Sequence, residues 1–194
     1  MKKLIGKNKF RTAVFISGRG SNLLSLIKFS LNKNSPIIIQ AIVSNRSRAK
    51  GLDLAKKYNI KKKVVSFKKK KLAESKILEF LKKKRINLVC LAGFMKVLTK
   101  DFINKYSGTI LNIHPSLLPK YKGLNTHERT IKNNEKYSGC TVHLVNSKID
   151  SGKIILQKKV RITKKDNAKT LSKKILKQEH ILYPRALRKY LFNL

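Results

Sequence analysis

Short apolar runs alternate with longer stretches of helical spacing between residues 13 and 113. The runs rich in β-branched residues predict strands over residues 13–16, 37–43, 64–65, 87–91 and 109–113. Between them, apolar residues recur at the spacing of one helix face, which predicts helices over residues 21–31, 49–58, 72–83 and 100–106. Strands that alternate with helices are typical of right-handed crossovers. The pattern therefore predicts an α/β fold with a doubly wound, mainly parallel sheet.

The pattern changes after residue 113. A loop rich in Pro and Gly over residues 114–123 precedes a short helix expected at 126–133, and residues 140–145 and 154–162 then alternate like half-exposed strands. These two strands predict an antiparallel edge towards the C-terminus. A long final helix is expected from Asn167, with Pro184 kinking or breaking it. Because no repeat or linker divides the sequence, we expect a single domain over residues 1–194.

The charge of the chain first suggests a polyanionic partner. The 194 residues carry 47 Lys+Arg against 9 Asp+Glu, a formal net charge of +38, while the apolar fraction of 41% is too high for a disordered basic tail. However, most of the basic residues are lysines spread over the whole chain, and Trp is absent. Nucleic-acid readers usually concentrate arginine and stacking aromatics, so the composition does not require a nucleic-acid partner.

The cysteines and apolar runs indicate a cellular setting. Cys90 and Cys140 form neither a C-x-x-C pair nor a metal-spaced cluster, which favours a reducing, cytoplasmic location and no bound metal. Cys90 lies in an apolar run and is expected in the core. No run is long enough to span a membrane, so we expect no membrane partner.

A glycine-rich turn follows the first predicted strand directly and leads into a helix. In the sequence Ser17-Gly18-Arg19-Gly20-Ser21-Asn22, the glycines permit a sharp turn and Ser21 or Asn22 can cap the helix. The free amides at such a helix start favour a phosphate. The turn lacks the ending of a P-loop and the third glycine of the dinucleotide motif. A plain tight turn with a capped helix is an equally good interpretation.

The second candidate is Asn112-Ile113-His114, where the fifth predicted strand ends. Alternation along a strand places Asn112 and His114 on the same side, so an amide that can donate to an oxyanion lies beside an imidazole that can move a proton. His127, His143 and His180 are expected to be structural.

Two of the few acidic residues are the remaining candidates. Asp150, between Ile149 and Ser151-Gly152, either forms a surface salt bridge or approaches His114 and favours its protonated form. Glu179 is a weaker candidate, and on sequence features alone an exposed helical carboxylate is the simpler interpretation.

Together these motifs resemble the phosphoribosylglycinamide formyltransferase family, the folate-dependent enzymes of purine synthesis. The resemblance rests on Ile16–Leu23, Leu91–Met95, Asn112–Tyr121 with Gly123, Asp150-x-Gly152 and Gln178-Glu179-His180, in order and with family-like spacing. It covers nearly the whole chain, from about Thr12 to Pro184. It implies a Rossmann-like formyltransferase fold.

The resemblance also implies roles for individual residues. Gly20, Ser21 and Asn22 would cradle the ribose phosphate of the substrate, and Glu179 would contact the ribosylglycinamide. The backbone of Met95, Lys96, Val97 and Leu98 would hold the pteridine of 10-formyltetrahydrofolate, with Asn112 beside it, and a basic residue near Lys70 would contact the folate. Asn112, His114 and Asp150 match the catalytic trio. A cis peptide is implied at Leu118-Pro119.

The expected reaction transfers the formyl group of 10-formyltetrahydrofolate to the amine of glycinamide ribonucleotide. Asn112 and protonated His114 would stabilise the oxyanion, and Asp150 would hold His114 and raise its pKa. Small anionic substrates are then the expected partners, and the chain would be a monomer or a weak homodimer. Three positions depart from the family pattern: Arg19, Lys122 and Leu176.

Three alternatives remain. Methionyl-tRNA formyltransferase shares the catalytic half of the resemblance, and basic charge would suit tRNA, but that enzyme carries a further C-terminal β-domain. Formyltetrahydrofolate deformylase usually carries an extra N-terminal regulatory domain. A non-catalytic RNA-binding protein on an enzyme fold would bind RNA with a steep dependence on salt.

Overall fold

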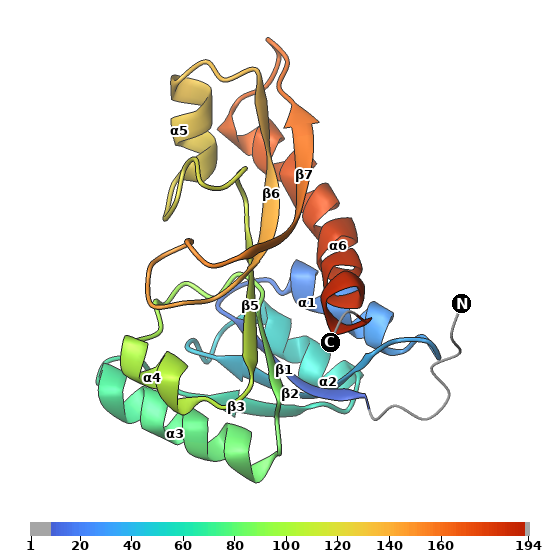
Figure 1. The fold of residues 1–194 in the computed structure, drawn as a ribbon, viewed down its shortest axis with the longest axis vertical. Helices are drawn as coiled ribbons and strands as arrows, with labels where there is room; N and C mark the ends of the chain where they lie inside the picture. Colours follow the sequence, from blue (N-terminus) through green and yellow to red (C-terminus); the bar gives the residue numbers. More distant parts are fainter. Residues whose placement is uncertain (1–8, 193–194) are drawn as a thin grey trace.

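A seven-stranded sheet organises the molecule, in the order β3-β2-β1-β4-β5-β6-β7. The computed structural model describes residues 9–192. The strands are β1 (Phe10–Ile16), β2 (Ile37–Ser44), β3 (Lys61–Val64), β4 (Leu88–Leu91), β5 (Thr109–His114), β6 (Tyr137–Leu144) and β7 (Ile154–Arg161). Strands β1 to β5 pair in parallel, whereas β6 and β7 are antiparallel, which confirms the mainly parallel sheet with an antiparallel edge (Figure 1).

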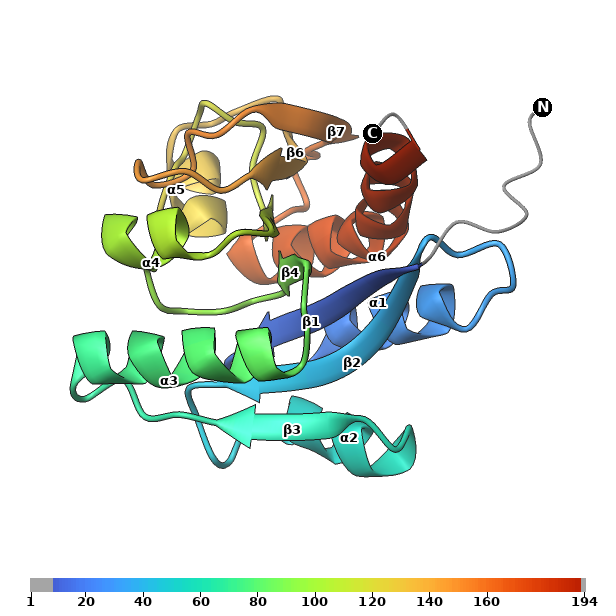
Figure 2. The same cartoon turned by 60° about the horizontal axis from the view of Figure 1, so that its bottom comes forward.

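Helices cover both faces of the sheet (Figures 1 and 2). They are α1 (Ser21–Ser30), α2 (Asp53–Lys57), α3 (Lys70–Lys83), α4 (Lys100–Lys105), α5 (Thr126–Lys132) and α6 (Ala168–Phe192). One buried apolar cluster joins α1, α2 and α6 to the sheet, and a second joins α3 and α4 to its other face. The strands contribute alternate residues to the two clusters: Val14 and Ile16 of β1 lie in the first, Ala13 and Phe15 in the second.

Two predicted elements differ from the structure near the second crossover. The helix expected at 49–58 is a 3-10 turn over Lys50–Leu52 followed by the short helix α2. Gly51 in that turn lies against the backbone of Gly18 and Gly20. This contact fixes the position of the chain just before α2 begins. The third strand occupies Lys61–Val64 rather than 64–65. Its three lysines, which an apolar pattern does not assign to a strand, belong to it because their backbone pairs with β2.

Pro184 lies inside α6 and does not break it. Since proline has no N–H, the carbonyl of His180, four residues earlier, loses its helical donor. The hydroxyl of Ser25 in α1 donates to that carbonyl at 2.6 Å. Figure 2 shows the last, dark red turns of α6 running in a different direction from its first turns, as expected for a proline kink.

Ser17 connects three loops at the carboxyl ends of the parallel strands. Its hydroxyl donates to Asn45 after β2 and accepts the N–H of Met95 after β4, and its own N–H donates to the carbonyl of Gly93. Ligands of doubly wound sheets bind at this end of the strands. Ser17 therefore fixes the loops that border the expected site.

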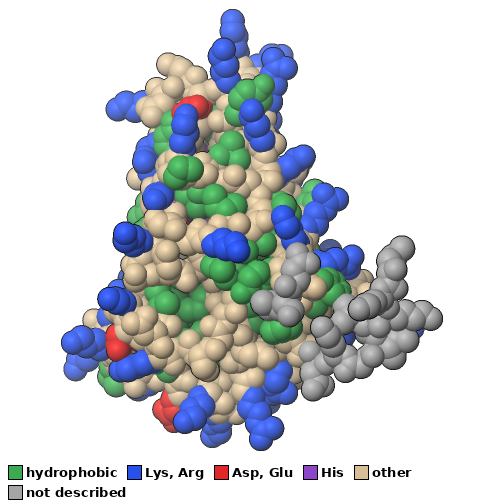
Figure 3. Space-filling model, in the orientation of Figure 1, with side chains coloured by type: hydrophobic (Ala, Val, Ile, Leu, Met, Phe, Trp, Pro, Cys, Tyr) green, Lys and Arg blue, Asp and Glu red, His purple; other side chains and the backbone are tan. Residues whose placement is uncertain are grey.

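Basic side chains are scattered over the face of the molecule seen in Figure 3 rather than gathered in one patch. In Figure 3 they lie from one end of the visible face to the other, with few acidic side chains between them. Among residues 9–192, no helix combines the length and apolarity needed to cross a membrane.

Candidate active site

Four polar side chains converge where β5 and β6 lie side by side. Antiparallel register places His143 of β6 directly opposite Asn112 of β5. Asn112 Nδ2 lies 3.4 Å from an oxygen of Asp150, and His114 Nδ1 lies 3.3 Å from the other carboxylate oxygen. The structure thus brings Asn112, His114 and Asp150 together, with both β5 residues facing the same side. We call Asn112, His114, His143 and Asp150 the histidine–aspartate cluster.

The loop that carries Asp150 is fixed tightly to the end of β6. Asp150 has a left-handed backbone with φ of 45°, which aspartate tolerates better than most residues. A Cβ on Gly152 would lie 1.8 Å from the carbonyl oxygen of Leu144, so only glycine fits there. The N–H of Gly123 donates to Asp150 Oδ2 at 2.9 Å. The Asp150-x-Gly152 motif therefore encodes a loop shape as well as a carboxylate.

His114 is buried, and both of its ring nitrogens have acceptors beside them. Nε2 lies 2.9 Å from the carbonyl oxygen of Tyr121, and Nδ1 faces Asp150. These contacts favour a ring that carries hydrogen on both nitrogens. Burial nevertheless outweighs the contacts with Tyr121 and Asp150, so the pKa of His114 lies below its ordinary value. Asp150 raises the pKa of His114, as predicted, but the effect of burial is larger and opposite.

His143 belongs to the site, although the sequence suggested a structural role. Its Nδ1 donates to the carbonyl of Leu144 at 2.8 Å, and its Nε2 lies 3.2 Å from Asn112 Nδ2 and 3.5 Å from Asp150. Nε2 accepts from Asn112 in a neutral ring and donates toward Asp150 in a protonated one. The strand register, which the sequence alone did not supply, is the signal that identifies it.

The carboxyl group of Asp150 favours its ionised form. Burial raises its pKa, but the contacts with His143, the Gly123 N–H and His114 outweigh burial and hold the pKa below its ordinary value. An ionised Asp150 can accept a proton relayed from the site.

A second group of polar residues lies at the start of α1. Gly20 is the N-cap of the helix with φ of 77°, and a Cβ there would lie 2.7 Å from the Cα of Gly51. Within residues 9–192 no side chain caps this helix start, so the expected capping by Ser21 or Asn22 is wrong and both residues belong to the helix itself. The first amides of a helix, left without intrahelical partners, form an anion site. We call residues 18–22 the Gly20 turn.

Asn22 extends the Gly20 turn to α6. Its Nδ2 donates to Glu179 Oε2 at 2.6 Å, and Glu179 is buried at 7% exposure. The interpretation of Glu179 as an exposed helical carboxylate is therefore wrong. Burial raises the pKa of Glu179, and the hydrogen bond from Asn22 opposes this effect. Asn22 Oδ1 is also buried and has no hydrogen-bond partner among the residues that the structure describes.

The segment over residues 93–98 is the third part of the candidate site, after the histidine–aspartate cluster and the Gly20 turn. Its position is fixed by Phe94, which packs edge-on against Phe15 and Phe67. At its end, both the N–H and the hydroxyl of Thr99 donate to the buried carboxylate of Glu74. The fixed backbone exposes the side chains of three of the predicted folate contacts, Met95, Lys96 and Val97, whereas that of Leu98 is buried.

Lys70 lies exposed at the start of α3. No hydrogen bond or ion pair within residues 9–192 joins its side chain to the histidine–aspartate cluster. A cavity of about 410 Å³ lies between β3 and α3, and Lys70 is not among its lining residues, which are Lys63, Val64, Val65, Ser66, Lys68, Lys69, Leu72, Ala73 and Lys76. The remaining histidines, His127 and His180, each keep one buried ring nitrogen that has no partner within the described part of the chain. No group of three or more His, Cys, Asp or Glu in residues 9–192 is arranged to hold a metal ion.

Comparison with known proteins identifies the relatives of this chain. The formyl transferase family model matches residues 10–187. The chain is 39% identical over 181 residues to phosphoribosylglycinamide formyltransferase of Haemophilus influenzae, covering 92% of this chain and 85% of that protein. It is 42% identical to a human trifunctional purine biosynthetic protein, covering 94% of this chain but only 18% of that longer protein. The crystal structure of phosphoribosylglycinamide formyltransferase from Anaplasma phagocytophilum superposes with a TM-score of 0.91 at 39% identity, over 96% of this chain and 88% of that one. The cis peptide at Leu118-Pro119 agrees with the resemblance seen in the sequence.

Proposed function

This chain belongs to the formyl transferase family, and from that membership we propose that it transfers the formyl group of 10-formyltetrahydrofolate to the amine of 5′-phosphoribosylglycinamide. The products would be formylglycinamide ribonucleotide and tetrahydrofolate, in the purine biosynthesis named by the relatives. One observation carries the proposal at the level of chemistry. Asp150 lies 3.4 Å from Asn112 Nδ2 and 3.3 Å from His114 Nδ1, which places an amide donor and an imidazole around one carboxylate, as acyl transfer can use.

In the proposed reaction the amine attacks the formyl carbon and a tetrahedral intermediate forms. The bond between the formyl carbon and the folate nitrogen then breaks, and that nitrogen gains the proton that the amine loses, so the folate departs as tetrahydrofolate. Asn112 Nδ2 and an N–H of His114 donate to the oxygen that gains negative charge, which is the usual way of stabilising such an intermediate. Since His114 Nε2 is bound to the carbonyl of Tyr121, its donation to an oxyanion through Nε2 would replace that contact.

Asp150 serves two purposes in this proposal. Its carboxylate holds His114 Nδ1, which keeps the ring oriented and favours the protonated form that can donate. It also accepts, directly or through water, the proton that the attacking amine must lose. The contact with the Gly123 N–H fixes the carboxylate while it does so.

The Gly20 turn and Glu179 are the proposed ribosylglycinamide site. The uncapped start of α1 offers amides and a positive dipole end to a phosphate, with Gly20, Ser21 and Asn22 at that position. Glu179 offers a carboxylate acceptor beside Asn22. For the folate, we propose the backbone of Met95, Lys96, Val97 and Leu98, and Lys70 with its lysine neighbours for the carboxylates of the tail.

The assay that tests this function supplies 10-formyltetrahydrofolate with either 5′-phosphoribosylglycinamide or charged initiator tRNA and follows the folate product. We expect turnover with the ribonucleotide alone. Turnover only with tRNA would replace this proposal by a methionyl-tRNA formyltransferase. No turnover with either, together with tight and salt-dependent RNA binding, would favour the non-catalytic RNA-binding protein.

We also propose a reducing, cytoplasmic setting and small anionic substrates as the partners. The two cysteines, Cys90 and Cys140, are both free and buried, which supports the first part. The state of monomer or weak homodimer stays a prediction that sedimentation velocity can test.

A further inference from the structure

The backbone of residues 121–123 touches both titrating members of the proposed catalytic trio. The Tyr121 carbonyl accepts from His114 Nε2 at 2.9 Å, and the Gly123 N–H donates to Asp150 Oδ2 at 2.9 Å. Tyr121 has a φ of 57°, a left-handed conformation that is unfavourable for a bulky residue and needs support from its surroundings. The supports of this loop therefore bear directly on the geometry of the trio.

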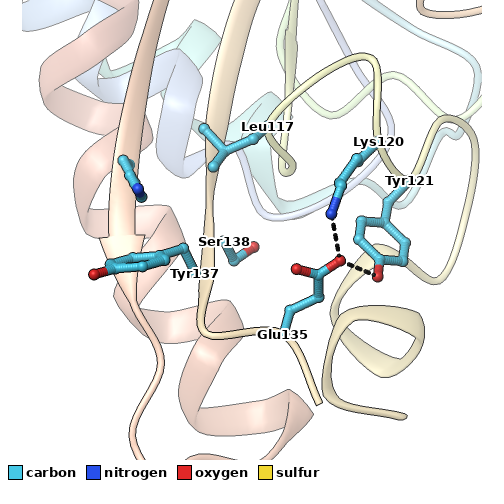
Figure 4. A pocket seen from close by; sticks show the side chains of 7 residues that line it. Leu117, Lys120, Tyr121, Glu135, Tyr137 and Ser138 are labelled. Carbon is cyan, nitrogen blue, oxygen red and sulfur yellow. Dashed lines mark hydrogen bonds and ion pairs between the residues drawn. The ribbon is translucent and has the colours of Figure 1, made fainter. Parts of the chain in front are cut away.

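The side chain of Tyr121 is held on its ring and at its hydroxyl. The hydroxyl donates to Glu135 at 2.9 Å and accepts from Asn133 Nδ2 at 3.0 Å. Figure 4 shows Tyr121 and Lys120 both directed toward Glu135, which also binds Lys120 Nζ at 2.8 Å. The guanidinium of Arg129 lies over the ring, 5.3 Å from its centroid.

Arg129 also binds the backbone on either side of Gly123. Its Nη1 donates to the carbonyl of Lys122 at 2.7 Å and to that of Leu124 at 3.3 Å. One guanidinium from α5 thus contacts the ring of Tyr121 and two carbonyls of the loop. The planar guanidinium can stack on the ring while its Nη1 donates to both carbonyls, whereas the compact ammonium of lysine has no planar group to stack.

We propose that Arg129 is a positioning residue, which holds the Tyr121–Leu124 loop so that its backbone presents the Tyr121 carbonyl to His114 and the Gly123 N–H to Asp150. This role rests on the proposed function, because it acts on the trio assigned there. The hydrogen bonds of Arg129 itself go to the carbonyls of Lys122 and Leu124. Its effect reaches the reaction through two backbone groups.

The charge of Arg129 gives the role a second signature. Several groups act on the pKa of His114: burial lowers it, the Tyr121 carbonyl and Asp150 raise it, and His143 and Arg129 lower it. The pKa of His127, on the same helix as Arg129, is lowered by burial and, to a smaller extent, by His114. Removing the positive charge at position 129 therefore shifts the pKa of His114 upward, while a lysine at that position leaves the charge in place.

The experiment compares Arg129→Gln, Arg129→Lys and the matched control Lys132→Gln, an exposed position on the same helix. We expect kcat for formyl transfer to fall about tenfold in both Arg129 variants, with KM for both substrates nearly unchanged, since small misplacements of catalytic groups are costly. The His114 pKa, followed by NMR in the free protein, should fall in Arg129→Lys, which loosens the Tyr121 contact but keeps the charge, and should be higher in Arg129→Gln than in Arg129→Lys because the charge is also removed there. Exchange of the Gly123 amide with solvent should accelerate in both, and Lys132→Gln should match the wild type throughout.

Two results would overturn the role of Arg129. One is a kcat within twofold of the control in both Arg129 variants, and the other is unchanged Gly123 amide exchange in correctly folded protein. A wild type that shows no formyl transfer to 5′-phosphoribosylglycinamide would instead refute the proposed function. The amide exchange and the His114 titration would still report on the loop in that case.

Discussion

The histidine–aspartate cluster and the Gly20 turn lie at the carboxyl ends of strands in one sheet, yet the chain secures them differently. In the cluster each side chain contacts at least one other member. Backbone groups of Tyr121, Gly123 and Leu144 form further hydrogen bonds to His114, Asp150 and His143 respectively. At the Gly20 turn the helix start has no side-chain cap within residues 9–192, and Asn22 has a single bond to Glu179. The cluster is thus preorganised by side-chain hydrogen bonds, and the turn by close backbone approach. Changes to charge and hydrogen bonding should damage the first, and changes to shape the second.

Asp150→Asn tests the preorganised cluster and should have the largest effect. The amide keeps the size of the side chain but removes the charge that favours protonated His114 and accepts the proton. We expect kcat to fall roughly 10²–10⁴-fold, as for loss of general acid–base help. Steady-state kinetics measure it, with Asp101→Asn, an exposed residue paired with Lys105, as the control that stays at the wild-type rate. A near wild-type rate for folded Asp150→Asn would remove Asp150 from the mechanism.

Gly20→Ala tests the close backbone contact between the Gly20 turn and Gly51. The new Cβ would meet Gly51 at 2.7 Å in a left-handed conformation, so the free energy of unfolding should fall by about 3 kcal/mol. Urea denaturation measures the loss. Gly18→Ala is the matched control, because no heavy atom lies within 4 Å of its Cβ and its φ is ordinary. Equal stability of the two variants would show that the turn tolerates side chains.

Glu179→Gln separates stability from activity at the Gly20 turn. We expect kcat/KM for 5′-phosphoribosylglycinamide to fall about tenfold through the loss of a charged acceptor. The same variant should have a higher Tm at neutral pH, because burial raises the pKa of Glu179 and its charged form is unfavourable in the folded state.

The pH dependence of the Glu179→Gln effect has a definite sign. Because the pKa of Glu179 is higher in the folded state than in the unfolded state, its charge lowers the free energy of unfolding of the wild type at a pH above the folded pKa. This loss disappears as the pH falls below the ordinary pKa of glutamate, where the carboxyl group is protonated in both states. The gain in Tm should therefore be largest at neutral pH and vanish in acid, whereas Glu79→Gln, at an exposed position of α3, should show no such trend. A lower Tm for Glu179→Gln at neutral pH would contradict the buried-charge argument.

Ser25→Ala should have the smallest effect on stability. It removes a hydrogen bond between α6 and α1, the helix that begins at the Gly20 turn. The variant leaves the His180 carbonyl without the donor that replaces the missing N–H of Pro184. The free energy of unfolding should fall by about 1 kcal/mol relative to Ser30→Ala, because the hydroxyl of Ser30 donates to the carbonyl of Ile27 within its own helix. Thermal unfolding of both variants measures the difference, and equal stabilities would mean that the kink does not need Ser25.

The apolar pattern was sufficient to predict the positions of most strands. It failed for β3, where backbone pairing forms a strand from residues that are mostly lysine. Strands β1, β2, β4 and β5 carry buried β-branched runs, so their positions could be predicted. Lys61–Val64 pairs through its backbone with β2 while its side chains point mostly to solvent. Backbone pairing of this kind leaves no trace in an apolar count.

For the candidate site, residues adjacent in sequence were predictable and partners from other elements were not. Asn112 and His114 follow from strand alternation alone. His143 depends on the register between β5 and β6, and Gly51 on the contact of two loops 31 positions apart, so neither signal exists in a local stretch. The burial that lowers the pKa of His114 likewise depends on the assembled fold.

Both outer strands of the sheet carry rows of basic residues, and this has a consequence for the protein in a crowded solution. β3 contributes Lys61, Lys62 and Lys63, and β7 contributes Lys158, Lys159 and Arg161. An edge strand presents unpaired backbone groups to any other chain, and charge along it discourages pairing between molecules. Two copies that approach edge to edge therefore repel each other before their strands can join. We therefore expect part of the +38 charge to resist aggregation, and this effect should weaken as salt screens the charge.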